Sequence, residues 1–342
     1  MSRRYDVVVG TGGIGSGIFL ALEGNRTLGR EESRPADLLD QRDYCKLHIV
    51  CHYVRRLLGP EVAVLPIGKV GRDDAGRAVL QEMRATGLDT ALVTTSTRPT
   101  LFAVCFLYPD GDGGNLSTTR SASSDVGTSD VQGAAQLFAA HPGRGVALAL
   151  PEVPLVARRA LLELATAHEW LRVAGVVPDE LEQVRDSGLL GLVDVLALNI
   201  DEAATLGGVS VERPAAEVVA AALTALADLR SPARVVVTAG ARGSWTWDGH
   251  DVVHAPASDP GGEVISTAGA GDAHLSGVVV GLIAGLELAP ANAFASIVSG
   301  LKVRSAHTIN PDIDPRAVVD AAARRGVALP TELFDVLAGA RA

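Results

Sequence analysis

The chain of 342 residues contains few aromatic residues, few cysteines and little positive charge. Aromatic side chains make up 4% of it, and its apolar residues are mainly Ala, Val and Leu. This composition suits helices packed on buried parallel strands better than an aromatic-rich β-sandwich. With 47% hydrophobic and only 20% charged residues, the chain can bury a large core in one sizeable domain or two modest ones. We therefore expect a folded α/β protein.

The scarcity of positive charge and of cysteine argues against two classes of protein. Forty acidic against thirty basic residues give a net charge of −10, which leaves no basic footprint for neutralising nucleic-acid phosphates. The odd number of cysteines, three, argues against a disulfide framework and favours a reducing compartment. We expect a cytoplasmic protein that does not bind nucleic acid.

Long hydrophobic runs are also missing. The first residues lack the apolar core of about 7–15 residues that a secretory signal needs, because Val7 to Val9 runs directly into Gly10. The most apolar stretch, Gly277 to Leu286, is far shorter than the roughly 20 residues that cross a bilayer. We expect no membrane partner and interpret this stretch as a buried helix.

Short β-branched segments alternate with longer Ala- and Leu-rich segments of helical period. This alternation is typical of βα units around a mostly parallel sheet. The expected strands are Asp6–Val9, Val62–Ile67, Val146–Leu150, Val193–Leu198 and Val235–Thr238. The expected helices include Tyr44–Leu58, Asp74–Thr86, Pro154–His168, Pro214–Leu229, Gly271–Gly285 and Pro290–Ser305.

The segment Thr97–Thr119 interrupts this alternation. After Pro99-Thr100, an alternating apolar run extends to Tyr108, and Pro109 to Gly114 then supplies a cluster of turn residues. Such a sequence predicts a β-hairpin. We expect a small β-lid here.

A glycine-rich segment follows the first expected strand. Gly10 to Gly15 fits the dinucleotide-binding pattern G-x-G-x-x-G, and Glu31 and Glu32 lie about 20 residues on, where a ribose-binding acid is expected. Residues 25–30 are, however, too polar for the buried second strand that such a site requires. We therefore favour a tight glycine-rich connection and keep an NAD-dependent oxidoreductase as the weaker alternative.

Cys45, His48 and His52 share one face of an expected helix. Their spacing of three and four residues would let three zinc ligands converge. No acid lies beside the first histidine, as the base of a metalloprotease would, and Ile49-Val50-Cys51 makes the helix amphipathic. Ordinary packing with a polar rim is the favoured interpretation, and a metal site is the alternative.

The segment Ser266–Asp272 carries the most specific signal. It consists of small residues up to Asp272 and leads directly into the apolar helix Ala273–Gly285. Small residues let a ligand approach the backbone, and the unpaired amides and dipole at a helix start favour an anion. A helix cap alone would explain one polar residue, but not the run of small residues before it. We interpret the segment as a phosphate cradle.

These segments together resemble the PfkB, or ribokinase-like, family of ATP-dependent carbohydrate kinases. Ser266–Asp272 is similar to the family's D-T-x-G-A-G-D, and other matching segments follow the family order over roughly residues 60–305. They are Gly68–Gly76, Pro99-Thr100 with Pro109-Asp110-Gly111, Asn199–Ala203 and Thr238–Gly243. The resemblance implies a doubly wound, mostly parallel sheet flanked by helices, one kinase domain over residues 1–342, and a lid from parts of about 11–35 and 97–120.

The resemblance also implies ATP-dependent transfer of a γ-phosphoryl group to a hydroxyl of a small sugar-like or polyol substrate. Asp272 would be the general base, with Gly269, Ala270 and Gly271 holding the transferring group. The nucleotide side would comprise Asn199, Glu202, Thr238, Gly240, Gly243, Thr267 and Ser296, and Glu202 would hold Mg²⁺ through water. From the residues alone, Asn199 and Glu202 fit a helix capping box equally well.

The substrate side departs most from the family. The usual G-G-x-x-x-N is missing, and Arg42 to His48 occupies its place. The candidate substrate contacts are Gly12, Gly13, Asn25, Arg30, Asp43, Lys46 and His48. Both signs of charge occur among them. This favours an acceptor that carries several hydroxyls, with the option of an anionic group, over a neutral ribose.

Further departures concern cofactors and turnover. Ser266 replaces an aspartate that the family associates with a monovalent cation, which puts potassium activation in doubt. His274 replaces the usual aromatic residue, and Ser296 stands where many members have Asn. A ligand-binding pseudokinase on the same fold is therefore the second hypothesis, which the retained Asp272 weakens. The exposed strand edges of a lid would also favour a homodimer.

Overall fold

The centre of the fold is a nine-stranded sheet with the order β13-β12-β11-β10-β9-β8-β1-β4-β5. The computed structural model describes residues 3–110, 113–227, 229 and 233–340. Neighbouring strands from β11 to β5 pair in parallel, and β12 and β13 extend one edge antiparallel. The strands are β1 (Val7–Thr11), β4 (Ala63–Gly71), β5 (Val93–Ser96), β8 (Gly145–Ala149), β9 (Leu171–Gly175), β10 (Val195–Asn199), β11 (Arg234–Thr238), β12 (Ser244–Trp247) and β13 (Val252–Ala255).

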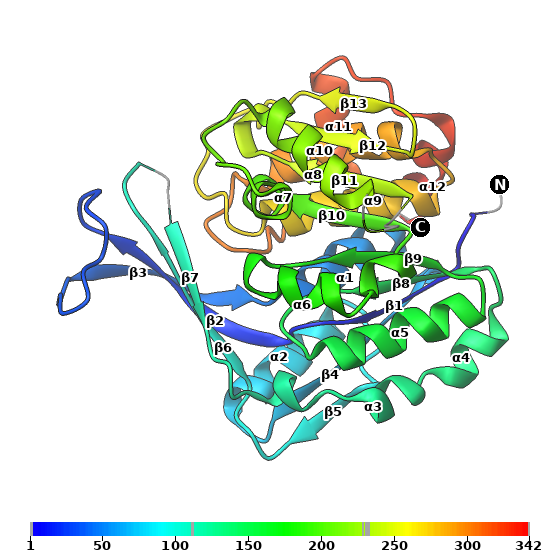
Figure 1. The fold of residues 1–342 in the computed structure, drawn as a ribbon, viewed down its shortest axis with the longest axis horizontal. Coiled ribbons are helices and arrows are strands. Elements are labelled where there is room, and N and C mark those ends of the chain that lie inside the picture. The colour runs from blue at the N-terminus through cyan, green and yellow to red at the C-terminus, as the bar shows by residue number, and fades with distance from the viewer. Residues whose placement is uncertain (1–2, 111–112, 228, 230–232, 341–342) are drawn as a thin grey trace.

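Both faces of this sheet are buried because successive apolar side chains point to opposite sides. On β1, Val8 packs into one core, whereas Val7 and Val9 pack into another on the opposite face. β11 repeats the pattern, with Val236 on the first side and Val235 on the second. One layer contains α1 (Lys46–Leu58), α2 (Asp74–Ala85), α9 (Ala270–Ile283), α10 (Leu288–Lys302), α11 (Pro315–Arg324) and α12 (Thr331–Gly339). The other contains α3 (Thr128–Gln132), α4 (Ala135–Ala140), α5 (Leu155–Ala167), α6 (Leu181–Asp186), α7 (Ile200–Gly207) and α8 (Ala215–Ala227) (Figure 1).

The predicted helices appear as α1, α2, α5, α8, α9 and α10, with small shifts at their ends. The expected buried helix at Gly277 is confirmed, since this part of α9 packs tightly on α10. A Cβ at Gly277 would lie 2.6 Å from Cα of Ala295, so the two helices approach where a side chain is absent. Among the described residues, no helix has the length and hydropathy needed to span a bilayer.

A second sheet, with the order β3-β2-β6-β7, projects from the body (Figure 1); it lies where the lid was expected, and we refer to it as the lid. Its strands are β2 (Gly15–Leu22), β3 (Ala36–Tyr44), β6 (Leu101–Leu107) and β7 (Gly113–Ser117). β6 and β7 pair antiparallel, which confirms the predicted hairpin, although residues 111 and 112 of its turn lie outside the described residues. β3 continues the lid beyond the predicted boundary at residue 35. The segment Gly10 to Gly15 leads into strand β2 and not into a helix, so the dinucleotide-binding interpretation is wrong.

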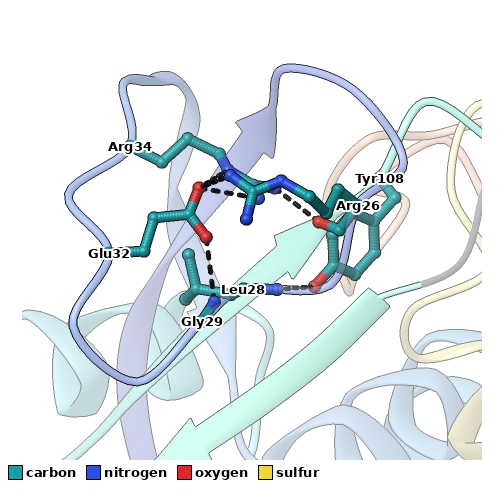
Figure 2. Close-up of polar contacts among 6 residues, drawn as sticks. All are labelled: Arg26, Leu28, Gly29, Glu32, Arg34 and Tyr108. Atoms are coloured by element: carbon teal, nitrogen blue, oxygen red, sulfur yellow. Dashed lines mark hydrogen bonds and ion pairs between the residues drawn. The ribbon is translucent and has the colours of Figure 1, made fainter.

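The tip of the lid is an ordered loop between β2 and β3. Glu32 accepts hydrogen bonds from Nε of Arg34 at 2.9 Å and from the amide of Gly29 at 2.9 Å, and it also pairs with Arg26. Figure 2 shows this network, in which Arg34 also donates to the carbonyl of Arg26. The hydrogen bond from Arg34 holds the pKa of Glu32 below its ordinary value. Glu32 is therefore occupied in shaping the loop, which removes it as a ribose-binding acid.

The lid is attached to the body through Asp73. Its carboxylate accepts from the amide of Gly76 at 2.8 Å and so caps α2, and it also accepts from the amide and hydroxyl of Thr100 at the start of β6. A cap of this kind typically contributes about 1 kcal/mol to a helix. One side chain thus joins α2 to Thr100, the residue immediately before the lid hairpin.

Candidate functional site

The candidate site is a cavity of about 710 Å³ where the carboxyl ends of β10 and β11 meet the start of α9. Open α/β sheets place ligands at this edge. The predicted residues that line it are Lys46, Asn199, Glu202, Thr238, Gly240, Gly243, Thr267, Gly269, Ala270, Gly271, Asp272 and Ser296. The structure therefore brings the catalytic and nucleotide-side candidates together around one space.

The first turn of α9 forms the small-residue cradle. Gly269 has φ +74°, and a Cβ there would lie 2.6 Å from the carbonyl oxygen of Thr308, so only glycine fits without strain. A Cβ at Gly271 would meet no atom within 4 Å, so this position opens into the cavity. The amide of Ala270 already donates to the carbonyl of Thr267 at 3.0 Å. The later amides of the first turn, from Gly271 and Asp272, remain suited to an anion.

Asp272 and Lys46 face each other at this cradle. Nζ of Lys46, at the start of α1, lies 3.9 Å from Oδ1 of Asp272. Burial raises the pKa of Asp272, and the charges of Lys46 and Lys302 oppose that rise. Asp272 in turn raises the pKa of Lys46, so the lysine is a cation at neutral pH. A carboxylate with a raised pKa beside a fixed cation is suited to accept a proton.

Asn199 and Glu202 form a capping box at the start of α7. Oδ1 of Asn199 accepts from the amide of Glu202, and the Glu202 carboxylate accepts from both the amide and the side chain of Asn199, at 2.8 to 3.0 Å. The capping interpretation is thus realised, and both residues still line the cavity. Burial raises the pKa of Glu202 to about 7. Because both carboxylate oxygens already accept hydrogen bonds, this pair suits a metal contact through water better than direct ligation.

The far wall of the cavity is formed by β11, with the turn that follows it, and by the facing helices α9 and α10. Gly243 has φ +87°, and a Cβ there would lie 2.2 Å from the carbonyl oxygen of Ala255, so the turn after β11 requires glycine. His274 also lines the cavity, and its Nε2 lies 2.7 Å from Oδ1 of Asn292. Burial lowers the pKa of His274 to about 4, so its imidazole is neutral at pH 7.

Glu152 was not among the predicted residues. It follows β8 with φ +75°, beside the switch point between β8 and β1, and its Oε2 accepts from the amide of Lys46 at 3.2 Å. A Cβ at Gly13 would lie 2.1 Å from that oxygen, so the predicted glycine segment makes room for this carboxylate. Gly12 packs next to it, against Leu150 and Leu47. A carboxylate directly after a predicted strand was the signal that would have identified Glu152.

Asp43 lies at the base of the lid, where its side chain is 2% exposed. Its carboxylate accepts from Sγ of Cys105 at 3.0 Å and is hydrogen bonded to Thr308. Burial raises the pKa of Asp43, and the negative charge of Asp272 adds to the rise. Asp43 is therefore electrostatically coupled to the proposed base, as a residue on the acceptor side would be.

Lys302 is a second residue that the sequence did not reveal. Its side chain is fully buried, and Nζ donates to the carbonyl of Ser266 at 3.1 Å and of Ser305 at 3.4 Å. Burial lowers its pKa to about 7, while Asp43 and Asp272 act to raise it. The amino group of Lys302 thus contacts the backbone of Ser266. Ser266 stands at the position where the family has an aspartate associated with a monovalent cation.

Of the predicted substrate contacts, Lys46 lines the cavity, whereas Gly12, Gly13, Asp43, His48, Asn25 and Arg30 do not. The position of His48 is a correction: its side chain is fully buried between α1 and α2, with Nε2 2.5 Å from Oε2 of Glu82. The helical period turns it away from Lys46, which lies two residues earlier. Asn25 and Arg30 are exposed in the loop at the lid tip, where Oδ1 of Asn25 accepts from the amide of Asp110. Contact between these two residues and a substrate stays a prediction.

Glu152 gives the free protein a pH-dependent stability. Burial raises its pKa to about 7, whereas in an unfolded chain Glu titrates near about 4.3. Between these values the folded state binds more protons, so the free energy of unfolding falls as the pH rises. Urea unfolding of Glu152→Gln should show a smaller loss between about pH 5 and about pH 7.5, while Glu202 contributes equally in both proteins. An identical loss in the two proteins would contradict the raised pKa.

Comparisons with known proteins agree on one family. The family model for pfkB family carbohydrate kinases matches residues 50–315. The ribokinase structure from Giardia lamblia superposes with a TM-score of 0.79 at 17% identity, covering 94% of this chain and 99% of that chain. Ribokinase from Cryptococcus neoformans var. grubii serotype A in complex with ADP gives 0.78 at 20% identity, with the same coverage of 94% and 99%.

A nucleoside kinase is also similar in structure. The Burkholderia thailandensis enzyme in complex with inosine gives a TM-score of 0.71 at 16% identity, covering 94% of this chain and 98% of that chain. A search of curated protein sequences finds no matching relative. At these identities the structural likeness establishes the fold, while the family model spans more than half of the chain. The chain belongs to the pfkB family of carbohydrate kinases.

Proposed function

We propose that the protein transfers the γ-phosphoryl group of ATP to a hydroxyl of a small polar molecule. The observation that carries this proposal is the half-buried Asp272 carboxylate, which borders a cavity of about 710 Å³ together with the open first turn of α9. Structures of related folds hold ADP, or ribose and ATP, which supports a nucleotide as donor. The coarser activity, a sugar or nucleoside kinase, follows from the family.

In this mechanism Asp272 takes the proton from the attacking hydroxyl. The hydroxyl oxygen then forms a bond to the γ-phosphorus as the bond between that phosphorus and the β,γ-bridging oxygen breaks, and ADP leaves. The amides of Gly271 and Asp272 hold the negative charge on the transferring group, where positioning and electrostatics supply most of the catalysis. Lys46 lies 3.9 Å from Asp272 and keeps positive charge at the same place.

Glu202 and Asn199 fit a magnesium site of the water-mediated kind. Their oxygens lie at the carboxyl end of β10 on the cavity wall, and Mg²⁺ keeps most of its water ligands in such sites. A bound Mg²⁺ would supply charge neutralisation between the β- and γ-phosphates. Glu202 and Asn199 would orient the waters that the ion retains.

The acceptor site lies around Glu152, Asp43 and Lys46. Two carboxyl groups and one ammonium in a partly closed site favour an acceptor that offers several hydrogen-bond donors and one group able to meet a cation. Inosine is bound by the similar nucleoside kinase and ribose by a similar ribokinase, so both classes belong in the test.

The direct test is a panel of sugars, polyols, sugar acids and nucleosides assayed for ADP release with ATP and Mg²⁺. We expect one class to raise ADP release far above the rate with ATP alone, and mass spectrometry to find the phosphorylated product. Tight ATP binding without turnover on any acceptor would favour the pseudokinase. Binding of neither ATP nor Mg²⁺–ATP in a thermal-shift assay would reject the proposal.

Activity should depend little on the choice between sodium and potassium. Nζ of Lys302 already donates to the carbonyl of Ser266, so a group of the chain occupies an oxygen beside the cradle that a bound cation would otherwise contact. We expect similar kcat values in NaCl and KCl at equal ionic strength. Strong and selective activation by potassium would show that other groups complete a cation site.

Replacement of Asp43 tests the acceptor side separately from the nucleotide side. Because a hydrogen bond to a charged group contributes about 1.5–3 kcal/mol, Asp43→Ala should raise KM for the acceptor by about tenfold or more with little change in KM for ATP. Asp37→Ala is the matched control, since Asp37 is exposed on the same strand β3. An unchanged acceptor profile in Asp43→Ala would place the substrate elsewhere.

A further inference from the structure

A second group of metal-ligating side chains lies between α1 and α2, outside the cavity. His48 and His52 are one turn apart on α1, and Glu82 is on α2. One ligand atom from each of the three lies within 4.8 Å of the others. The sequence had suggested Cys45 as the partner of the two histidines, but the fold supplies a carboxylate from another helix instead.

The two imidazoles are buried, and Nδ1 of His52 lies 3.2 Å from Oγ1 of Thr86. The His48 side chain is fully buried and that of His52 is 8% exposed. Within the described part of the chain, neither ring nitrogen of His48 nor Nε2 of His52 has a hydrogen-bond partner. Nε2 of His48 lies 2.5 Å from Oε2 of Glu82, and that oxygen is also without a hydrogen bond of good geometry. Buried polar atoms left unsatisfied are costly. Nε2 of His48 and Nδ1 of His52, which lies 3.6 Å from Oε1 of Glu82, face the same carboxylate, so one nitrogen of each ring and the carboxylate surround a point that an ion would fill.

The chemistry of the set selects the kind of ion. Two imidazoles and one carboxylate are the ligands of many zinc sites, whereas Mg²⁺ prefers oxygen ligands alone. The Glu82 side chain is 30% exposed, so it can move aside to admit an ion, and a water can fill the fourth position.

We propose that His48, His52 and Glu82 form a binding site for one first-row divalent metal ion, with Zn²⁺ as the expected occupant. The ion would join α1, which carries Lys46 to the cavity, to α2, which is capped by the Asp73 that also holds Thr100 of the lid. The site is independent of the proposed kinase reaction, and its role is to fix the packing of these two helices.

Metal binding is measured on untagged, chelator-treated protein without nucleotide. Titration with ZnCl₂ in a calorimeter should give one ion per chain, and elemental analysis after gel filtration should find the same ratio. The melting temperature should rise with ZnCl₂ or CoCl₂ and much less with MgCl₂. Zinc that neither binds in the titration nor remains after gel filtration would overturn the proposal and leave His48 and Glu82 as a buried ion pair.

Variants assign the ligands. His52→Gln and Glu82→Gln should each weaken zinc binding by at least about 10- to 100-fold, the range already seen when only an outer partner of a ligand is removed. His254→Gln, at an exposed histidine on β13, is the matched control and should bind zinc like the parent. Cys45→Ser should also bind normally. Unchanged affinity in both ligand variants would contradict the assignment.

One further measurement uses the parent protein alone, so it does not require any variant to fold. X-ray absorption of the zinc-loaded parent protein should show a shell of nitrogen and oxygen atoms only, with the outer-shell pattern of imidazole. A sulfur atom among the ligands would place the ion on a cysteine and overturn the proposed site.

Discussion

Asp272→Asn is expected to lower kcat by about 10² to 10⁴-fold, the range usually contributed by a general base. The amide keeps the size of the side chain and its position beside Lys46, but it cannot accept the proton of the attacking hydroxyl. Burial without a negative charge does not penalise the amide as it does the carboxylate, so the folded state should persist. Steady-state kinetics with the acceptor identified by the panel measure kcat, and calorimetric titration measures whether ATP still binds.

A matched variant separates loss of the base from a general effect of removing a charge. Asp335→Asn changes an exposed aspartate on α12, remote in sequence from the cradle, and should leave kcat unchanged. Near-native turnover in Asp272→Asn would contradict the mechanism. A parallel loss of ATP binding would show that Asp272 acts in nucleotide binding rather than as the base.

Gly271→Ala is expected to separate activity from stability. The added Cβ meets no protein atom within 4 Å, and alanine in place of glycine within a helix favours folding by about 0.5–1 kcal/mol. The same methyl group enters the cradle where the transferring phosphoryl group would lie. A displacement of about 1 Å at reacting groups can cost about 10²-fold in rate, so kcat/KM should fall by about that factor while the melting temperature stays equal or rises.

Gly281→Ala is the reverse control on the same helix. A Cβ at Gly281 would lie 2.7 Å from Cβ of Ala291 on α10, so we expect the overpacking to lower the free energy of unfolding by about 1–3 kcal/mol. Position 281 does not line the cavity, and kinetic constants should change little at temperatures where the variant is folded. If Gly271→Ala were as active as the parent, the transferring phosphoryl group could not lie at the first turn of α9.

The parts of the fold that follow from local patterns could be predicted from the sequence. The long apolar runs of α9 and α10 indicate buried helices, and the short apolar runs of β1, β8 and β11 indicate buried strands, because nearly all of their side chains face a core. The turn residues from Pro109 onward identified the lid hairpin. β3 was missed because its residues, including Asp37 and Asp43, are polar, and it is held by pairing with β2 rather than by its own composition.

The candidate site divides in the same way. Asp272 and its small neighbours form one continuous segment, so their arrangement is local and visible in the sequence. Glu152 and Lys302 reach the site from separate elements, and only the packing of β8 and α10 around the cradle brings them there. His48 was misplaced because it lies two positions after Lys46, and two helical positions rotate a side chain by more than half a turn, to the other side of α1.

The network around Glu32 at the lid tip changes where conformational entropy is lost. A loop of polar residues that became ordered only on contact with an acceptor would lose about 1–2 kcal/mol of backbone entropy per residue during binding. Here Arg34, Arg26 and the amide of Gly29 hold that loop around one carboxylate through contacts within the chain. The ordering cost therefore falls on folding, so a ligand that contacted this loop would meet a preorganised surface and its affinity would not be reduced by that cost.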